Sequence, residues 1–249
     1  MKYGICHLSI VPIREENSHK SELVSQLLYG DCFKITSEKK DWMQISTLQD
    51  SYTGWIDNKQ IKEISQKEAE KISGTGAQYC QQLVDYIEAD DQTLTTVVMG
   101  SNIAAARFLN QTYKGTASKG VNKKSNLIKT ASLYLNAPYL WGGKTPLGID
   151  CSGLVQMVYR INGYAIPRDA SQQVNLGETL SFIDESEAGD LAFFDDHEGN
   201  IVHVGLLLEN HYILHAHGKV RIDRIDQTGI YNFDTQQHSH KLRIIKKII

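Results

Sequence analysis

The first sixty residues alternate bulky and polar side chains in short runs, and this pattern predicts β-strands. Asp41–Ser46 alternates over most of its length, as a strand with one buried face does. Gly54–Ile56 follows the turn-like patch Gln49–Ser51, and an earlier apolar run leads into Cys32–Ile35. Short strands spaced about ten residues apart predict a small barrel, which we assign to residues 1–63.

The region after residue 63 has a different pattern of residues. Residues 66–92 mix helix-forming side chains with a Gly-Thr-Gly breaker, and Leu94–Asn102 is rich in β-branched residues and ends in a turn. These features predict a second small β-rich domain over residues 64–118. The mostly polar run Ser118–Lys124 is typical of a linker.

From residue 125 onward the pattern predicts helices followed by strands. A helix is expected from Asn126, which is a suitable N-cap, to Asn136, with Pro138 ending it. A second helix with an apolar stripe is expected over 152–162. Strands are then expected over four segments, namely 191–194, 201–208, 212–217 and 242–245. Helices followed by an antiparallel meander predict an α+β domain over residues 125–249.

Composition narrows the class of protein. The chain has 249 residues, of which 41% are hydrophobic and 22% charged, with a net charge of −3. That balance lacks the basic field that holds nucleic acid, and no run approaches the roughly 18 apolar residues of a membrane span. The amino terminus lacks a secretory pattern and cysteine is sparse, so we expect a cytoplasmic protein, although a chain trimmed of an export signal would look the same.

The four cysteines do not resemble one another in context. Cys6, Cys32, Cys80 and Cys151 form no close metal-binding spacing, so no metal site is expected. The first three are interpreted as small buried apolar residues. Cys151 follows a glycine-rich segment and begins the second predicted helix, where free N–H groups and the helix dipole favour a thiolate. This context predicts a nucleophile, and acyl transfer through a thiol needs no cofactor.

Two histidines on neighbouring predicted strands are candidate bases. Opposed residues of a hairpin have numbers that sum to a constant, so His203 and His215 share a face only if the connecting loop has an odd length. A three-residue loop at 208–210 places His203 opposite His215. A loop at 209–211 places His203 opposite His217, with His215 on the diagonal. Either arrangement lets one imidazole accept the thiol proton while the other orients it.

Several sequence blocks in order carry a family resemblance. They are PYLWGG, GIDCSGLVQMVYR, PRDASQQ, AGDLAFF, HVGLLL and ILHAHG. Together, over about residues 125–249, they resemble the NlpC-type cysteine peptidases of bacterial cell-wall metabolism, which have a papain-like fold. The amino-terminal β-rich regions are similar to the bacterial SH3-like barrels often joined to such peptidases. Within the family, the chain looks closest to the gamma-D-glutamyl-L-diamino acid endopeptidases, which are dipeptidyl-peptidase VI-like.

The resemblance implies catalytic roles. Cys151 is the nucleophile, His203 the general base and then the acid, and His215 the residue that orients His203. The Tyr139 hydroxyl joins the Cys151 N–H in the oxyanion hole.

The resemblance also implies substrate contacts. Asp169 matches the residue that contacts the free amine of L-Ala, and Glu22 matches an acidic residue supplied by the barrel. A pair of carboxylates would neutralise an ammonium and demand that it be unblocked. The remaining predicted contacts are Tyr52, which closes the amine pocket, Trp141 and Ser152, which line the D-glutamate subsite, and Arg168, whose fork suits a carboxylate.

The implied activity is hydrolysis of the gamma-D-Glu-diamino acid bond in free L-Ala-gamma-D-Glu-diamino acid peptides during wall-peptide recycling. The expected partner is a murein peptide with a free amino-terminal L-Ala. We expect no nucleic-acid partner and no membrane span, and we expect the protein to be a monomer. Two other interpretations stay open: a wall-peptide-binding module without catalysis, and a papain-like amidase or acyltransferase with another substrate. The third substrate residue, diaminopimelate or lysine, also stays open.

Overall fold

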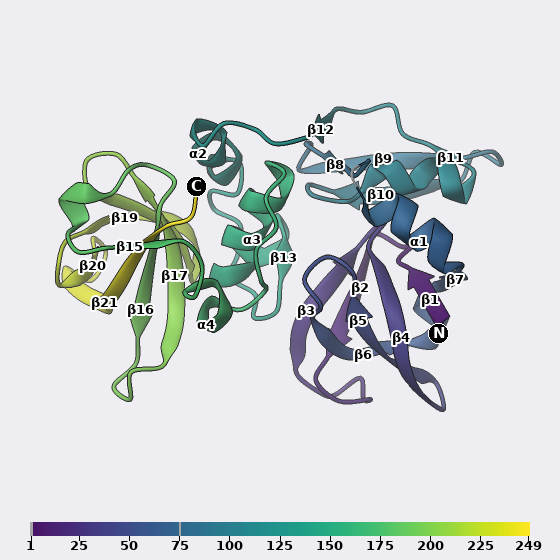
Figure 1. The fold of residues 1–249 in the computed structure, drawn as a ribbon, viewed down its shortest axis with the longest axis horizontal. Helices are drawn as coiled ribbons and strands as arrows, with labels where there is room; N and C mark the ends of the chain where they lie inside the picture. Colours follow the sequence, from purple (N-terminus) through teal and green to yellow (C-terminus); the bar gives the residue numbers. More distant parts are fainter. Residues whose placement is uncertain (1, 75) are drawn as a thin grey trace. The chain divides into compact units, whose positions relative to one another are not determined.

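A computed structural model describes residues 2–74 and 76–249, and internal contacts divide the chain into two compact units (Figure 1). The first unit contains Met1–Val121, Trp141–Pro146 and Arg160–Ala165. The second unit contains Asn122–Leu140, Leu147–Tyr159 and Ile166–Ile249.

The first unit begins with the predicted small barrel. Its antiparallel strands run in the order β3-β2-β6-β5-β4-β1-β7, and a short 3₁₀ turn, Asn58–Gln60, precedes the last of them. Strand β5 shows why the alternation was informative, because Met43 and Ile45 point into the core while their neighbours are half-buried. The strands are β1 (Lys2–Ile5), β2 (Ile10–Arg14), β3 (Leu23–Leu28), β4 (Cys32–Lys39), β5 (Trp42–Thr47), β6 (Thr53–Asp57) and β7 (Lys62–Ile64).

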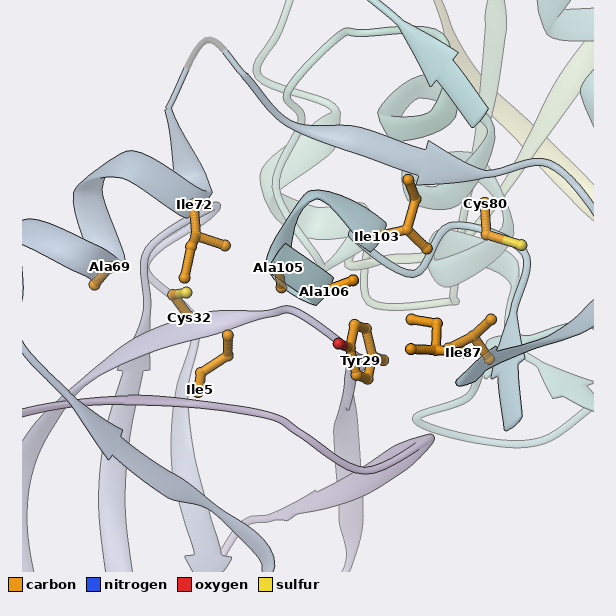
Figure 2. Close-up of a cluster of buried hydrophobic side chains, with 11 residues drawn as sticks. Ile5, Tyr29, Cys32, Ala69, Ile72, Cys80, Ile87, Ile103, Ala105 and Ala106 are labelled. Carbon is orange, nitrogen blue, oxygen red and sulfur yellow. The ribbon is translucent and has the colours of Figure 1, made fainter. Parts of the chain in front are cut away.

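The rest of the first unit shares a hydrophobic core with the barrel. Figure 2 shows Tyr29 and Cys32 of the barrel in one cluster with Ile72, Cys80 and Ile87 of the following stretch. That stretch folds as two separate sheets, β10-β9-β11 and β12-β8, and the second barrel predicted over 64–118 stays a prediction. Its elements are α1 (Gln66–Ser73), β8 (Gln78–Cys80), β9 (Val84–Ala89), β10 (Leu94–Val98), the 3₁₀ segment η2 (Ile103–Leu109), β11 (Gln111–Thr112) and β12 (Ala117–Lys119), and the unit also holds β13 (Lys144–Thr145).

The second unit has helices first and then an antiparallel sheet, which confirms the predicted α+β class. The sheet runs β15-β21-β16-β17-β18-β19-β20, and β20 also pairs with β21. The elements are α2 (Ser125–Ser132), β14 (Gly148–Ile149), α3 (Cys151–Ile161, its last two residues in the first unit), α4 (Ala170–Gln173), β15 (Glu178–Leu180), the 3₁₀ turn η3 (Ile183–Glu185), β16 (Leu191–Asp195), β17 (Ile201–Leu208), β18 (Tyr212–His217), β19 (Lys219–Ile225), β20 (Gly229–Asn232) and β21 (Gln237–Lys247).

Helix α2 corrects the helix predicted from Asn126 to Asn136. The N-cap position is Lys124, and Asn126 lies inside the first turn. The regular helix ends at Ser132, because the following N–H groups bond to carbonyls three residues back and Asn136 takes a left-handed conformation with φ 67°. Apolar residues therefore continue past the end of the helix, and Leu135 beyond it is exposed.

Three strands of the sheet, β15, β19 and β20, were not predicted, and β21 is much longer than the predicted segment 242–245. The sequence of β19, KVRIDRI, carries too many charges to stand out as a strand. Asp223 and Ile225 are nevertheless buried two residues apart on one face of the strand, and Val220 is buried on the other face. Within the described part of the chain, every helix is too short or too polar to span a bilayer.

Candidate active site

Cys151 is the first residue of α3, as predicted. The carboxylate of Asp150 accepts a hydrogen bond of 2.7 Å from the Gly153 N–H, which satisfies one of the free donors of the first turn. The Cys151 sulfur is nearly buried and accepts hydrogen bonds from the backbone N–H groups of Ser152 and Val204. Val204 follows His203 on β17, so the thiol lies against the strand that carries the predicted base.

Burial opposes the thiolate that the helix start favours. Burial raises the pKa of the Cys151 thiol to about 11, and the neighbouring Asp150 carboxylate adds to the effect. The N–H groups of Val204 and Ser152 and the charge of Arg168 act in the other direction but do not outweigh burial. Burial therefore favours the neutral thiol over the thiolate.

A buried ion pair holds the first turn of α3. The Arg168 guanidinium, 2% exposed, donates to both carboxylate oxygens of Asp150, at 3.0 and 2.5 Å, and to the Ser152 hydroxyl at 2.9 Å. Gln173, which the sequence interpretation missed, donates to the Ser152 carbonyl at 3.1 Å and to the Pro167 carbonyl at 2.8 Å. Arg168 and Ser152 thus pair with Asp150 of this chain, and their predicted substrate contacts stay predictions.

The histidine hairpin has the odd loop that parity required. Gly205 pairs with His215 and Leu208 with Tyr212, which leaves a three-residue loop at 209–211 and decides between the two registers. His215 accordingly lies diagonally across from His203, and the His203 Nε2 and the His215 Nδ1 are 2.9 Å apart. Gly205 leaves room for this contact, because a Cβ there would lie 3.0 Å from the His215 Cβ and closer still to Ile213.

Asp223 and Arg221 of β19 complete the hydrogen-bonded chain, and the sequence interpretation missed both. The His215 Nε2 lies 3.0 Å from the Asp223 Oδ2, and Arg221 donates from Nε to Oδ2 at 2.6 Å and from Nη2 to Oδ1 at 2.8 Å. The register pairs His215 with Arg221, so Asp223 is another diagonal neighbour. The same argument from opposed residue numbers, applied to the strand after the turn at Gly218, could have placed Asp223 on the face of His215.

His240 of β21 adds a third ring to the pair. It stacks on His203 with ring centroids 4.2 Å apart, and His217 meets it edge-on at 4.8 Å. Burial lowers the pKa of His203 well below its usual value, and His215, His240 and His217 lower it further. Burial also lowers the pKa of His240, to about 4. The imidazole of His203 is therefore neutral near pH 7 and able to accept a proton.

Tyr139 and Asp169 also belong to the second unit. Burial raises the pKa of the Tyr139 phenol to about 12, with contributions from Cys151 and Asp150, so its hydroxyl remains a donor as an oxyanion-hole role requires. Asp169 is half-buried, and its backbone carbonyl accepts hydrogen bonds from Gln172 and Gln173 at the start of α4.

Two of the three substrate contacts predicted in the first unit, Trp141 and Glu22, are hydrogen-bonded to each other. The Trp141 indole N–H donates to the Glu22 carboxylate, and the Tyr52 hydroxyl lies 3.5 Å from the Val24 carbonyl on β3. Gly142 allows the close approach, since it has φ +75° and a Cβ there would lie 2.3 Å from the Leu23 carbonyl oxygen. Their roles toward a substrate stay predictions.

The second unit places a thiol at the first turn of a helix, backbone N–H donors around it and a hydrogen-bonded imidazole pair on an antiparallel sheet. This combination defines a papain-like thiol hydrolase. Over residues 2–74 and 76–249, no cluster of acidic, cysteine and histidine side chains is arranged to hold a metal ion.

Comparisons with known proteins define the family. The model of the NlpC/P60 family matches residues 136–239, and that of the bacterial dipeptidyl-peptidase SH3 domain matches residues 13–61. The gamma-D-glutamyl-L-lysine dipeptidyl-peptidase of Bacillus subtilis is 30% identical over 212 residues, which cover 77% of this chain and 71% of the relative. The chain belongs to the NlpC/P60 family and is a cysteine peptidase of the bacterial cell wall.

Two further matches agree with this assignment. Dipeptidyl-peptidase 6 of Lysinibacillus sphaericus is 29% identical over 244 residues, which cover 83% of this chain and 86% of the relative. A crystal structure of an NlpC/P60 family protein from Bacillus cereus matches with a TM-score of 0.77 over 99% of both chains at 17% identity, which shows the shared fold.

Proposed function

We propose that this peptidase hydrolyses the gamma-D-Glu-diamino acid amide bond of free L-Ala-gamma-D-Glu-diamino acid peptides, in the recycling of cell-wall peptides. The observation that carries the proposal is the Cys151 sulfur lying against β17, whose His203 is hydrogen-bonded to His215. The relatives named as gamma-D-glutamyl-L-lysine dipeptidyl-peptidases support the choice of bond.

In the proposed reaction, the Cys151 sulfur attacks the gamma-carbonyl carbon of D-Glu while its proton passes to His203. The Cys151 N–H and the Tyr139 hydroxyl stabilise the oxyanion of the tetrahedral intermediate. His203 then gives the proton to the departing amine of the diamino acid, which leaves a thioester on Cys151. Water attacks the thioester as His203 takes one of its protons, and that proton returns to the sulfur as the acid is released.

The pKa directions favour proton transfer during the attack. Burial raises the thiol pKa to about 11 and lowers the His203 pKa well below its usual value, so both groups favour their neutral forms before the attack. The nucleophile is therefore generated as the carbon–sulfur bond forms, when the oxyanion hole and the charge on the imidazole are both stabilised.

The substrate preference is proposed to rest on the free ammonium of L-Ala. Glu22 and Asp169 are the carboxylates assigned to it by resemblance, and Trp141 fixes the orientation of the Glu22 carboxylate by its hydrogen bond. An ammonium recognised by carboxylates must be unblocked, and the L-Ala amine of intact peptidoglycan is blocked by its amide bond to muramic acid.

The decisive experiment is mass-spectrometric product analysis with the Cys151→Ala variant. The unchanged protein is expected to release L-Ala-D-Glu from a defined tripeptide with lysine or diaminopimelate at the third position. Cys151→Ala is expected to lose at least about 1,000-fold in kcat/KM with an unchanged circular dichroism spectrum, because the nucleophile is gone. Cys32→Ala, a buried cysteine of the first unit, is the matched control and should retain activity.

Four outcomes would contradict the proposal. Turnover by Cys151→Ala at the rate of the unchanged protein would show that Cys151 is not the nucleophile. Binding of the tripeptide without cleavage would favour the non-catalytic interpretation, and an amide formed with an added amine in place of the free acid would indicate an acyltransferase. Equal cleavage of intact sacculi and free tripeptide would remove the proposed role in recycling.

A further inference from the structure

We propose that Asp223 is a positioning residue of the reaction: held ionised by Arg221, it fixes the tautomers of His215 and His203 so that His203 presents an unprotonated nitrogen as base. The inference rests on the thiol chemistry proposed above and concerns the opposite end of the hydrogen-bonded chain from the sulfur.

The first step is the charge of Asp223. Its side chain is fully buried and has hydrogen bonds to both carboxylate oxygens, two from Arg221 and one to His215. Burial alone would raise the pKa of the carboxyl, but the hydrogen bonds from His215 and Arg221 lower it to about 2. A buried carboxylate held by a bidentate arginine is therefore ionised near pH 7 and acts there only as a hydrogen-bond acceptor.

Second, the charge of Asp223 determines which nitrogen of each histidine carries a proton. Because an ionised Asp223 only accepts, the Nε2 of His215 must carry the proton of their hydrogen bond. A neutral His215 then has a lone pair on Nδ1, which accepts from the Nε2–H of His203. That leaves the lone pair of His203 on Nδ1, where it can accept the proton of a thiol.

The third step concerns charge during the reaction. When His203 accepts the thiol proton it becomes an imidazolium in a buried environment, where an isolated charge is costly. The hydrogen bonds of His215 link His203 to the negatively charged Asp223, and the attraction between the two charges offsets part of that cost. Arg221 keeps Asp223 from drawing a full proton from His215, and its remaining Nη1 donates to the exposed Asp234 at 2.6 Å.

A pH-dependent readout must account for the other titratable groups around the chain. Those that face His215 and His203 from the packed strands are Cys151 of α3, His217 of β18, Arg221 and Asp223 of β19, Asp234 after β20 and His240 of β21.

The experiment is Asp223→Asn, measured by kcat and KM on the free tripeptide and by ¹⁵N NMR of the imidazole nitrogens. An Asn side chain can donate to the His215 Nε2, which reverses both tautomers and puts the proton of His203 on Nδ1. In a serine peptidase the matching change costs about 10,000-fold in kcat for this reason. We expect a loss of at least about 100-fold in kcat with KM within about twofold, together with exchanged protonated and unprotonated ¹⁵N signals.

Asp226→Asn is the matched control. Asp226 also pairs with a histidine, His238, at 3.0 Å, but both side chains are substantially exposed. This variant should keep kcat, KM and the imidazole signals of His203 and His215.

Arg221→Gln covers the case in which Asp223→Asn does not fold. Loss of the guanidinium leaves the Asp223 charge on His215 alone, so the pKa of His215 should rise and the acid limb of the kcat profile should move to higher pH. A merely structural residue would not move that limb. Asp223→Asn with kcat unchanged, or with unchanged His203 tautomer signals, would overturn the inference, as would a folded Arg221→Gln variant with an unshifted limb. Failure of the unchanged protein to cleave the tripeptide would instead count against the proposed function, and the NMR signals would still test Asp223.

Discussion

The two units bury their cysteines in opposite surroundings. In the first unit, Cys32 and Cys80 lie in a mainly apolar cluster with Ile72 and Ile87 (Figure 2), although Cys80 accepts a hydrogen bond from Tyr113, and Cys6 lies in the barrel core. In the second unit, Cys151 is just as buried but is surrounded by N–H donors and charged groups. Burial raises the pKa of the thiol in all four cases. Neither exposure nor acidity therefore distinguishes the predicted nucleophile; the groups around the sulfur do.

The cost of this arrangement is a polar core in the second unit. Arg168, Asp150, His215 and Asp223 are all nearly or fully buried, and each is held by hydrogen bonds or ion pairs. Buried polar groups are tolerated only when they are paired, and removing one partner is far more costly than removing a hydrocarbon contact of the same size. Three substitutions test this difference between the two units.

The largest effect is expected from Arg168→Met. It leaves the Asp150 carboxylate buried without its bidentate partner, and breaking a buried ion pair costs about 3–5 kcal/mol of the free energy of unfolding. Denaturant unfolding of the whole chain would measure the loss, and activity should fall with it because Asp150 holds the first turn of α3.

Lys247→Met provides the control for that measurement. Lys247 pairs with Glu187 in the same unit, but the two side chains are 41% and 63% exposed and the distance is 3.7 Å. Removing an exposed pair costs about 0–1 kcal/mol. If the two variants were equally stable, the buried polar groups would not carry the weight we assign to them.

A pH shift is expected from His240→Phe. The stacked His240 is one of the groups that lower the pKa of His203, so its removal should raise that pKa. A base is lost when it becomes protonated, so activity falls as the pH drops through its pKa, and the acid limb of the kcat/KM profile should move to higher pH. The variant keeps a ring of similar size against His203 and Phe194, which isolates the electrostatic effect. If the acid limb of the kcat/KM profile did not move, a group other than His203 would determine its pKa.

The smallest effect is expected in the first unit, from Glu22→Gln. The change removes one negative charge from the partner of Trp141 but keeps a hydrogen-bond acceptor. Exposed charge pairs contribute little, so we expect about a tenfold or smaller rise in KM for the free tripeptide. The ratio of rates for the free and amino-acetylated tripeptides should fall accordingly. Lys59→Gln, an exposed position on the same barrel, should leave that ratio unchanged.

The sequence allowed the hairpin of the histidines to be predicted in detail, because strand parity constrains which residues share a face. His203 and His215 could be paired from their numbers alone, and only the loop position was undecided. Asp223 escaped because β19 carries too many charges to be recognised as a strand. The argument from residue numbers applies only within strands that have been predicted.

The environment of Cys151 could not be predicted in the same way. The helix start is local and was found from spacing, but the burial that raises the pKa comes from packing against β17 and from the Asp150–Arg168 pair. Those contacts join residues far apart in the chain. The assignment of Arg168 to a substrate carboxylate had the same weakness, since its fork was recognisable but its partner was not.

The most direct test of the account is mass spectrometry of the intact chain, quenched with acid during turnover of the free tripeptide. The account predicts a transient mass increase equal to an L-Ala-D-Glu acyl group, located by peptide mapping on Cys151 and absent in Cys151→Ala. Continued turnover with no acyl group on the sulfur, or with the acyl group on another residue, would contradict it.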